Sequence, residues 1–184
     1  DRAMLEVCYG AGLRVSELTG LCCRDVVFGT GAHVRCEGKG RKARCTPLTQ
    51  SVAIVVRAWI KELHPRPDDP LFPNRRGAQL STDGVQFILT KHAAVARQQR
   101  PLLKGKKVSP HVLRHTAAMN LLHAGADTAT IALWLGHESS ETTHLYVEAN
   151  LEMKRRILER IEEPANANPR RKKTDTLLDF LNRL

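Results

Sequence analysis

The sequence predicts a mainly helical domain with a small antiparallel β-sheet, an α+β fold. Apolar residues recur at helical spacing in several long segments. Between residues 26 and 48 the period changes to strand-like alternation around a glycine-rich turn. With 184 residues, 42% of them hydrophobic, the chain can bury one well-packed core but not two large ones.

The first elements are two short helices. Helical spacing over residues 1–9 is interrupted by Gly10 and Gly12. Ser16 is predicted to cap a second helix that runs to about Leu21. Arg14 then lies at the turn between the helices, where its side chain could point into a cleft, although a lone arginine is more often a surface residue.

The alternating segment predicts a β-hairpin. The letters H-V-R-C-E alternate, G-K-G-R-K forms a turn, and A-R-C-T-P-L resumes the strand pattern. Four basic residues lie at or near its tip: Lys39, Arg41, Lys42 and Arg44. Such a tip could reach a DNA groove or a phosphate; a merely solvated turn is the alternative.

Two longer helices and a basic loop follow. Amphipathic spacing predicts helices over 49–63 and from Ser81 or Thr82 to about Gln98. The letters R-P-L-L-K-G-K-K-V then form a basic loop that ends at Ser109.

The segment from Ser109 onward carries the polar side chains of a candidate site. Pro110 suits the first turn of a helix, and His111 and Arg114 share one face of it. That helix is predicted to end at Gly125, and Asp127 or Thr128 can cap the next one.

Gly136 ends this next helix and puts His137 on the following turn. A third short helix carries Tyr146 at its far end. Two histidines, an arginine and a tyrosine with few acidic neighbours could bind an anion and attack it; the alternative is that His137 and Tyr146 only cap and pack.

We expect no metal and no cofactor. His111 and His115 have the spacing of a zinc-binding helix, but Val112 stands where that motif needs glutamate. The five cysteines form no C-x-x-C pattern, which predicts reduced intracellular thiols.

The charge balance indicates a polyanionic partner. Lys+Arg 29 against Asp+Glu 19 gives +10 and a pI near 9.8, which favours DNA or RNA over an acidic membrane surface. No run of about 18 apolar residues occurs, so we expect no membrane-spanning segment.

Taken together, these motifs resemble the tyrosine recombinases, most closely the Xer and phage-integrase branch. The resemblance rests on four motifs in the family's order, followed by a tyrosine nine residues after the last: G-L-R-V-S-E-L (12–18), G-K-G-R-K (38–42), H-V-L-R-H (111–115) and L-G-H (135–137). Ala117 and Ala118 depart from it where an aromatic residue is more usual, which affects packing rather than chemistry.

The resemblance implies the catalytic-domain fold of that family and a site of six residues: Arg14, Lys39, His111, Arg114, His137 and Tyr146. It implies a site-specific DNA recombinase that cuts and rejoins double-stranded DNA through a 3′-phosphotyrosine intermediate. Tyr146 would be the nucleophile and His111 its base, with Lys39 protonating the leaving oxygen. Dimer resolution, phage integration and transposition are all roles of this family, and the resemblance does not choose among them.

Two alternatives stay open. A type IB topoisomerase shares the chemistry but reseals the same strand, and a DNA-binding module could have lost catalysis. A strand-exchange assay compared with a relaxation assay distinguishes a recombinase from a topoisomerase. Covalent capture of DNA distinguishes a recombinase from a binding module without catalysis.

The expected domain organisation has three parts. Residues 1–163 form a catalytic domain with its beginning truncated and the family's amino-terminal core-binding domain absent, 164–174 form a basic linker, and 175–184 form a tail helix with an apolar stripe. In the family that the chain resembles, such a tail docks on a neighbouring subunit in a ring of four on DNA. Docking on its own domain is the alternative. The location implied is cytoplasmic, at the nucleoid.

Overall fold

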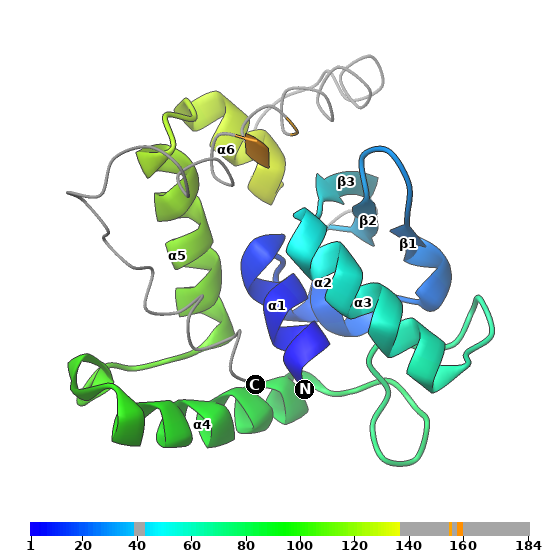
Figure 1. Ribbon diagram of the computed structural model, residues 1–184, viewed down its shortest axis with the longest axis horizontal. Helices are drawn as coiled ribbons and strands as arrows, with labels where there is room; N and C mark the ends of the chain where they lie inside the picture. The colour runs from blue at the N-terminus through cyan, green and yellow to red at the C-terminus, as the bar shows by residue number, and fades with distance from the viewer. Residues whose placement is uncertain (39–42, 137–154, 156–157, 160–184) are drawn as a thin grey trace.

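The computed structural model describes residues 1–38, 43–136, 155 and 158–159. It is mainly helical with one small antiparallel sheet, which confirms the predicted fold class (Figure 1). The α-helices whose bounds the structure describes are α1 (Arg2–Gly10), α2 (Val15–Gly20), α3 (Gln50–Leu63), α4 (Thr82–Gln99), α5 (Pro110–His123) and α6 (Thr128–Leu135). The described residues also form the 3₁₀ turns η1 (Cys23–Asp25) and η3 (Pro101–Leu103).

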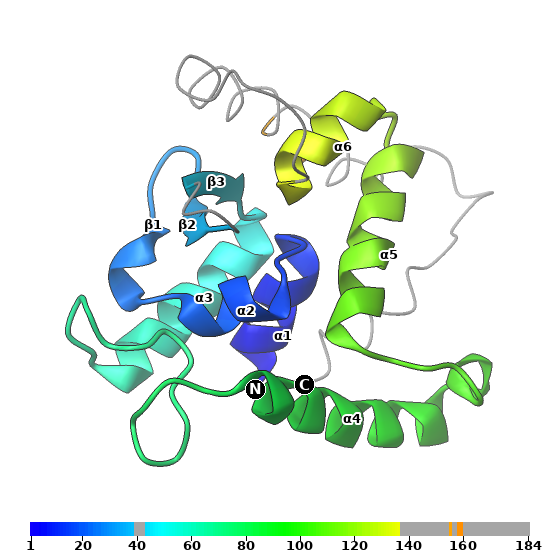
Figure 2. The same ribbon diagram turned by 180° about the vertical axis from the view of Figure 1, so that it is seen from behind.

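Helix α1 is the centre of the packing. All seven residues from Ala3 to Tyr9 are buried, including Glu6. A helix that is apolar nearly all round must be covered on all sides, and α3 and α5 pack on it (Figures 1 and 2). The α1 segment was therefore correctly predicted as a helix, and it forms the middle of the core.

The sheet has the order β1–β2–β3 and is antiparallel throughout. Its strands are β1 (Val26–Val27), β2 (His33–Glu37) and β3 (Ala43–Pro47). The β2–β3 hairpin confirms the alternation seen in the sequence, whereas the two-residue β1 is too short to leave a pattern. Cys36 lies opposite Arg44 and Cys45 opposite Arg35, so the two cysteines do not face each other across the hairpin.

Polar side chains fix the start of four helices, α3, α4, α5 and α6. Each N-cap side-chain oxygen accepts a hydrogen bond from the backbone N–H of the third helical residue, a donor that the helix itself leaves unpaired. These caps are Thr49, Ser81, Ser109 and Asp127.

The cap predicted for α2 is wrong. This helix begins at Val15, and its N-cap is Arg14, not Ser16. The reason lies three residues further on, where the Glu17 carboxylate accepts the backbone N–H of Arg14 at 2.7 Å.

Two apolar clusters of unequal size lie under these elements. The larger cluster joins α1, α2, the sheet, α3, the first half of α4 and Leu113 of α5. The smaller one consists of Leu121, Ala126, Trp134, Leu135 and Leu158. In the part of the chain that the structure describes, no helix combines the length and apolar character needed to cross a bilayer.

Candidate active site

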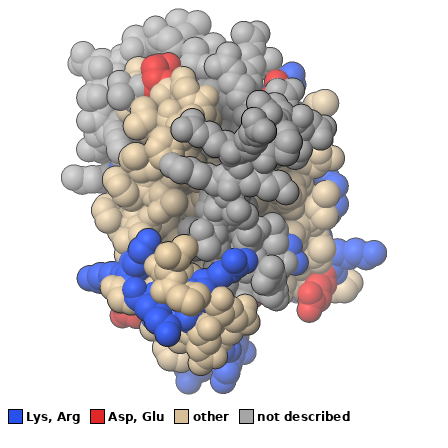
Figure 3. Space-filling view, turned by 60° about the vertical axis from the view of Figure 1, so that its left-hand side comes forward, with Lys and Arg blue, Asp and Glu red and all other residues tan. Residues whose placement is uncertain are grey.

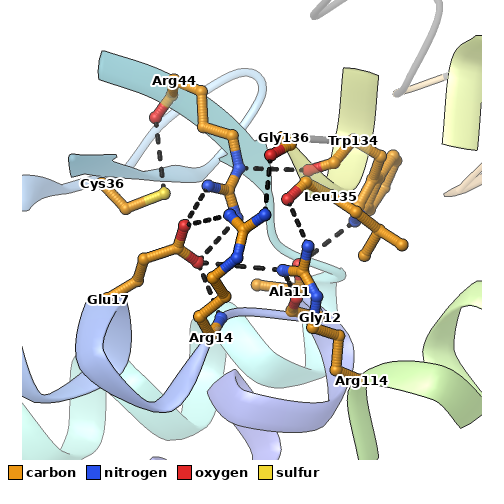
Figure 4. Close-up of polar contacts among 10 residues, drawn as sticks. All are labelled: Ala11, Gly12, Arg14, Glu17, Cys36, Arg44, Arg114, Trp134, Leu135 and Gly136. Carbon is orange, nitrogen blue, oxygen red and sulfur yellow. Dashed lines mark hydrogen bonds and ion pairs between the residues drawn. The ribbon is translucent and has the colours of Figure 1, made fainter. Parts of the chain in front are cut away.

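Arg14 lies where the chain turns from α1 into α2, as the sequence predicts. Its guanidinium group donates from Nη1 to Glu17 Oε1 at 3.0 Å and from Nη2 to the Gly136 carbonyl at 3.0 Å (Figure 4). The Arg14 side chain remains 37% exposed. It therefore bridges α2 and the end of α6 while keeping part of its surface open to solvent.

Arg114 comes to the same place from α5 but is buried. Its Nη1 donates to the Gly12 carbonyl at 2.7 Å and its Nη2 to the Leu135 carbonyl at 2.6 Å. Nη1 also lies 3.8 Å from Glu17 Oε2. Burial, and then the positive charge of Arg14, lower the pKa of Arg114 to about 10, which leaves it charged at neutral pH.

Glu17 is the carboxylate at the centre of this group, and the sequence reasoning assigned it no role. Its side chain is 2% exposed and accepts hydrogen bonds from Arg14 and Arg44. Burial alone would raise the pKa of Glu17, but the hydrogen bonds from Arg44 and Arg14 outweigh it and lower the pKa below its ordinary value. Glu17 is therefore the counter-charge for all three arginines.

Arg44 is the second residue that sequence reasoning missed. We expected it at or near a hairpin tip reaching toward DNA, but its side chain turns inward and is 11% exposed. Both η nitrogens donate to the Glu17 carboxylate, at 2.5 and 2.9 Å, and Nε donates to the Trp134 carbonyl at 3.2 Å. The buried Glu17 carboxylate explains why Arg44 points inward. Its two oxygens accept two parallel, charge-assisted hydrogen bonds from the guanidinium group, a geometry that water molecules do not provide.

Three consecutive carbonyls at the end of α6 each accept from a different arginine. Trp134 accepts from Arg44, Leu135 from Arg114 and Gly136 from Arg14 (Figure 4). The last carbonyls of a helix lack intrahelical donors and carry the negative end of its dipole, so cations are favoured there. We call these three acceptors the α6 carbonyl triplet.

Two glycines make this close approach possible. Gly12 has φ +62°, and a Cβ on it would lie 2.8 Å from Leu135 Cδ2. Gly136 has φ +66°, and a Cβ on it would lie 2.8 Å from Arg44 Nη1. Both positions need the left-handed backbone and the missing side chain, so glycine fits them for two independent reasons.

The structure brings together two of the six predicted site residues, Arg14 and Arg114. His111 is exposed near the start of α5, one turn before Arg114. Lys39 falls in the connection between β2 and β3 and, like His137 and Tyr146, lies outside the described residues. Gly136 of the carbonyl triplet directly precedes His137 in the sequence.

This cluster is built to hold an anion. Three guanidinium groups surround one carboxylate, which leaves an excess of positive charge. Within the described residues, Arg14 and Arg114 each donate two hydrogen bonds to protein oxygens, and a guanidinium group carries five N–H donors. A search of the described residues for three or more clustered metal-ligand side chains finds none.

A second basic surface lies at the end of α4 and over η3. It consists of Arg97, Arg100, Lys104, Lys106 and Lys107, with no acidic residue between positions 97 and 107. The three lysines are exposed, and Figure 3 shows basic side chains gathered on the face where this end of the molecule comes forward. Arg97 donates to the Lys106 carbonyl at 2.9 Å, which ties the loop back to α4.

Comparison with known proteins finds matches along most of the chain. The sequence model of the phage integrase family matches residues 1–153. A protein of Sinorhizobium fredii, named as an integrase/recombinase, is 51% identical over 184 residues, covering 100% of this chain and 55% of the relative. Tyrosine recombinase XerC of Syntrophus aciditrophicus is 38% identical over 163 residues, covering 82% of this chain and 49% of the relative.

The fold is also similar to a solved structure, the XerH site-specific recombinase bound to difH substrate in a pre-cleavage complex. The TM-score is 0.62 at 24% identity, over 90% of this chain and 44% of that one. The chain thus spans about half the length of the curated relatives that it matches.

Proposed function

Because the chain belongs to the phage integrase family, we propose that it is the catalytic domain of a tyrosine-type site-specific recombinase. It cuts and rejoins double-stranded DNA by transesterification through a 3′-phosphotyrosine intermediate. The observation that carries this proposal is the meeting of Arg14 and Arg114 at the α6 carbonyl triplet, directly before His137.

The two arginines suit phosphoryl transfer. When an oxygen nucleophile attacks a phosphodiester, negative charge grows on the non-bridging oxygens. A guanidinium group can donate two parallel, charge-assisted hydrogen bonds to such oxygens. Glu17 and the end of α6 already hold the two arginine side chains in place, so they need little rearrangement as that charge develops. Contacts that strengthen in the transition state are the ones that accelerate a reaction.

The remaining predicted residues supply the proton transfers. A tyrosine hydroxyl has an ordinary pKa of about 10 and needs a base or a positive field. His111 takes the hydroxyl proton of Tyr146 as the Tyr146 oxygen bonds to phosphorus. His137 orients a non-bridging oxygen of the phosphate. The bond from phosphorus to the 5′ oxygen breaks, Lys39 protonates that oxygen, and the 5′ hydroxyl of a second strand later reverses the step.

The proposed partner is double-stranded DNA with specific recombination sites, in the cytoplasm at the nucleoid. The XerH site-specific recombinase named above is bound to its difH substrate. The net charge of +10 and the basic surface over 97–107 support binding to DNA phosphates. DNA affinity should then fall linearly with salt on logarithmic axes, whereas a flat response contradicts a nucleic-acid partner.

Assembly as a tetramer through the tail is a further part of the proposal. The sequence of 175–184 has an apolar stripe, and about ten residues cannot remain helical alone in water, so the stripe must dock somewhere. Deleting 175–184 should leave single-site cleavage measurable and weaken assembly on paired sites. Normal assembly with a lower melting temperature means that the tail packs on its own domain.

Covalent capture tests the proposed function. A pool of nicked suicide duplexes, randomised across the strand-exchange region, is incubated with the full chain, and adducts are recovered on denaturing gels. The wild-type chain should form adducts, and Tyr146→Phe should bind the same DNA without forming any.

The chain contains only two tyrosines, which provides a matched control. The hydroxyl of Tyr9 is held inside the fold by Asn120 Nδ2 at 2.5 Å, so Tyr9→Phe should keep the adduct. An adduct with Tyr146→Phe contradicts the assigned nucleophile. Strand exchange between two captured duplexes, rather than relaxation of one supercoiled circle, separates a recombinase from a topoisomerase.

A further inference from the structure

We propose that Arg44 is a positioning residue for the reaction: it fixes Glu17 and the end of α6 so that Arg14 is presented to the phosphate. This inference rests on the proposed function and adds to it a residue outside the six predicted site residues. Arg44 lies in β3, two positions beyond the β2–β3 connection that contains Lys39.

The first step concerns the orientation of Glu17. Arg44 Nη1 donates to Oε1 and Nη2 donates to Oε2, a two-point contact that fixes both the position and the plane of the carboxylate. The same two oxygens accept the Arg14 side chain and the Arg14 backbone N–H. The orientation of Arg14 therefore depends on a carboxylate that Arg44 holds.

The second step concerns the end of α6. Arg44 Nε donates to the Trp134 carbonyl, and the Arg44 guanidinium group lies against Gly136, where a Cβ would come within 2.8 to 3.1 Å of three Arg44 atoms. The Gly136 carbonyl is the second acceptor of Arg14. Arg44 thus touches both residues to which the Arg14 side chain is anchored.

The third step is electrostatic. Arg14, Arg44 and Arg114 lie close enough that, after burial, Arg14 and Arg44 both help to lower the pKa of Arg114, while Glu17 and Cys36 act in the opposite direction. Three cations around one carboxylate repel one another, and a well-packed apolar side chain at position 44 would avoid this repulsion. The arrangement is costly for folding alone but useful where an anion must be held.

The experiment compares Arg44→Ala with Arg35→Ala in the full chain. Arg35 is an exposed arginine on the neighbouring strand β2, so both variants lose one positive charge from the hairpin. Single-turnover cleavage is measured at saturating concentrations of a duplex recovered by covalent capture. Arg44→Ala should cleave roughly 10- to 100-fold more slowly, the cost expected for a misplaced catalytic group, whereas Arg35→Ala should cleave like wild type.

A double-mutant cycle separates positioning from general loss of structure. If Arg44 acts through Arg14, the Arg14→Ala/Arg44→Ala double variant should cleave no more slowly than Arg14→Ala alone. Additive losses overturn the inference. So does equal cleavage by Arg44→Ala and Arg35→Ala.

A conservative variant covers the case in which Arg44→Ala does not fold. Arg44→Lys keeps the charge but loses the two-point contact, so it should fold, with a lower melting temperature than wild type, and still cleave slowly. Wild-type cleavage by a folded Arg44→Lys overturns the inference alone. A wild-type chain that captures no DNA overturns the proposed function and this inference with it.

Discussion

The part of the molecule built on α1 and the part that ends in α6 are held in different ways. The first part shares one large apolar cluster that runs through α1, α2, the sheet and α3. Among the described residues, the second has a cluster of five buried residues that includes Trp134. Helix α5 spans both, with Leu113 in the larger cluster and Leu121 in the smaller.

Within the described part of the chain, polar contacts join these two parts at the end of α6. Each arginine that binds the α6 carbonyl triplet comes from a different element: Arg14 from the start of α2, Arg44 from β3 and Arg114 from α5. Trp134 Nε1 adds a bond to the Ala11 carbonyl at 3.3 Å. The boundary between the two parts is therefore charged, and the same charges form the candidate site.

Removing the central carboxylate should break this boundary most severely. Glu17→Ala leaves Arg44 buried without its counter-charge, and the loss in unfolding free energy should be about 3–5 kcal/mol. Glu6→Ala is the matched control, because Glu6 is also buried but its partner Arg2 is 42% exposed and can be hydrated. Denaturant titration compares the two; equal losses contradict a special role for the boundary.

A methyl group at Gly12 should force the two parts apart. Gly12→Ala combines a left-handed backbone with a contact of 2.8 Å to Leu135, so we expect a loss of about 1–3 kcal/mol in unfolding free energy. Gly20→Ala is the control, since nothing lies within 4 Å of its added Cβ and its φ is not positive. A shift in the melting temperature of Gly20→Ala as large as that of Gly12→Ala contradicts this explanation.

Acid should weaken the boundary through Glu17. The pKa of Glu17 is lowered in the folded state, so its contribution to stability is fully present above its ordinary, unfolded pKa. That contribution is lost as the pH falls through the folded pKa. Glu17→Gln should flatten this acid dependence of the melting temperature. If Glu17→Gln keeps the acid dependence of the wild-type chain, the loss of stability at low pH comes from other groups.

The smallest expected effect comes from the two tryptophans, one in each part. Trp134→Phe loses the bond to Ala11, and Trp59→Phe loses its 2.8 Å bond to the Leu71 carbonyl. Each should cost about 1 kcal/mol of unfolding free energy, the usual value for one hydrogen bond. Only Trp134→Phe should also slow DNA cleavage, because the lost indole N–H ties the residue whose carbonyl accepts from Arg44 to Ala11; equal cleavage rates contradict this.

The helices and the hairpin were predictable because each leaves a local pattern. N-cap residues such as Ser81 and Asp127, and the glycine that ends α6, mark helix boundaries within a few positions. The resemblance to a known family also put Arg14 and Arg114 in one site, and the structure brings them together.

The support for these arginines was harder to foresee. Arg44 and the Trp134 carbonyl are 90 residues apart, and backbone carbonyls leave no trace in the sequence. The capping role of Glu17 could have been read from the sequence, because a glutamate three residues after the N-cap residue has the spacing of a capping box. That spacing predicts a local bond but not the three arginines that converge on it.

The most direct test of the central claim is the cleavage rate of Arg14→Ala compared with that of Arg24→Ala. Arg24 is a surface arginine that is 62% exposed and paired with Asp68, so both variants lose one charge, but only Arg14→Ala disturbs the boundary. At saturating concentrations of captured DNA, Arg14→Ala should cleave about 100-fold or more slowly than Arg24→Ala, as when a transition-state contact is removed. Equal rates for the two folded variants contradict the claim that the charged boundary is the reaction centre.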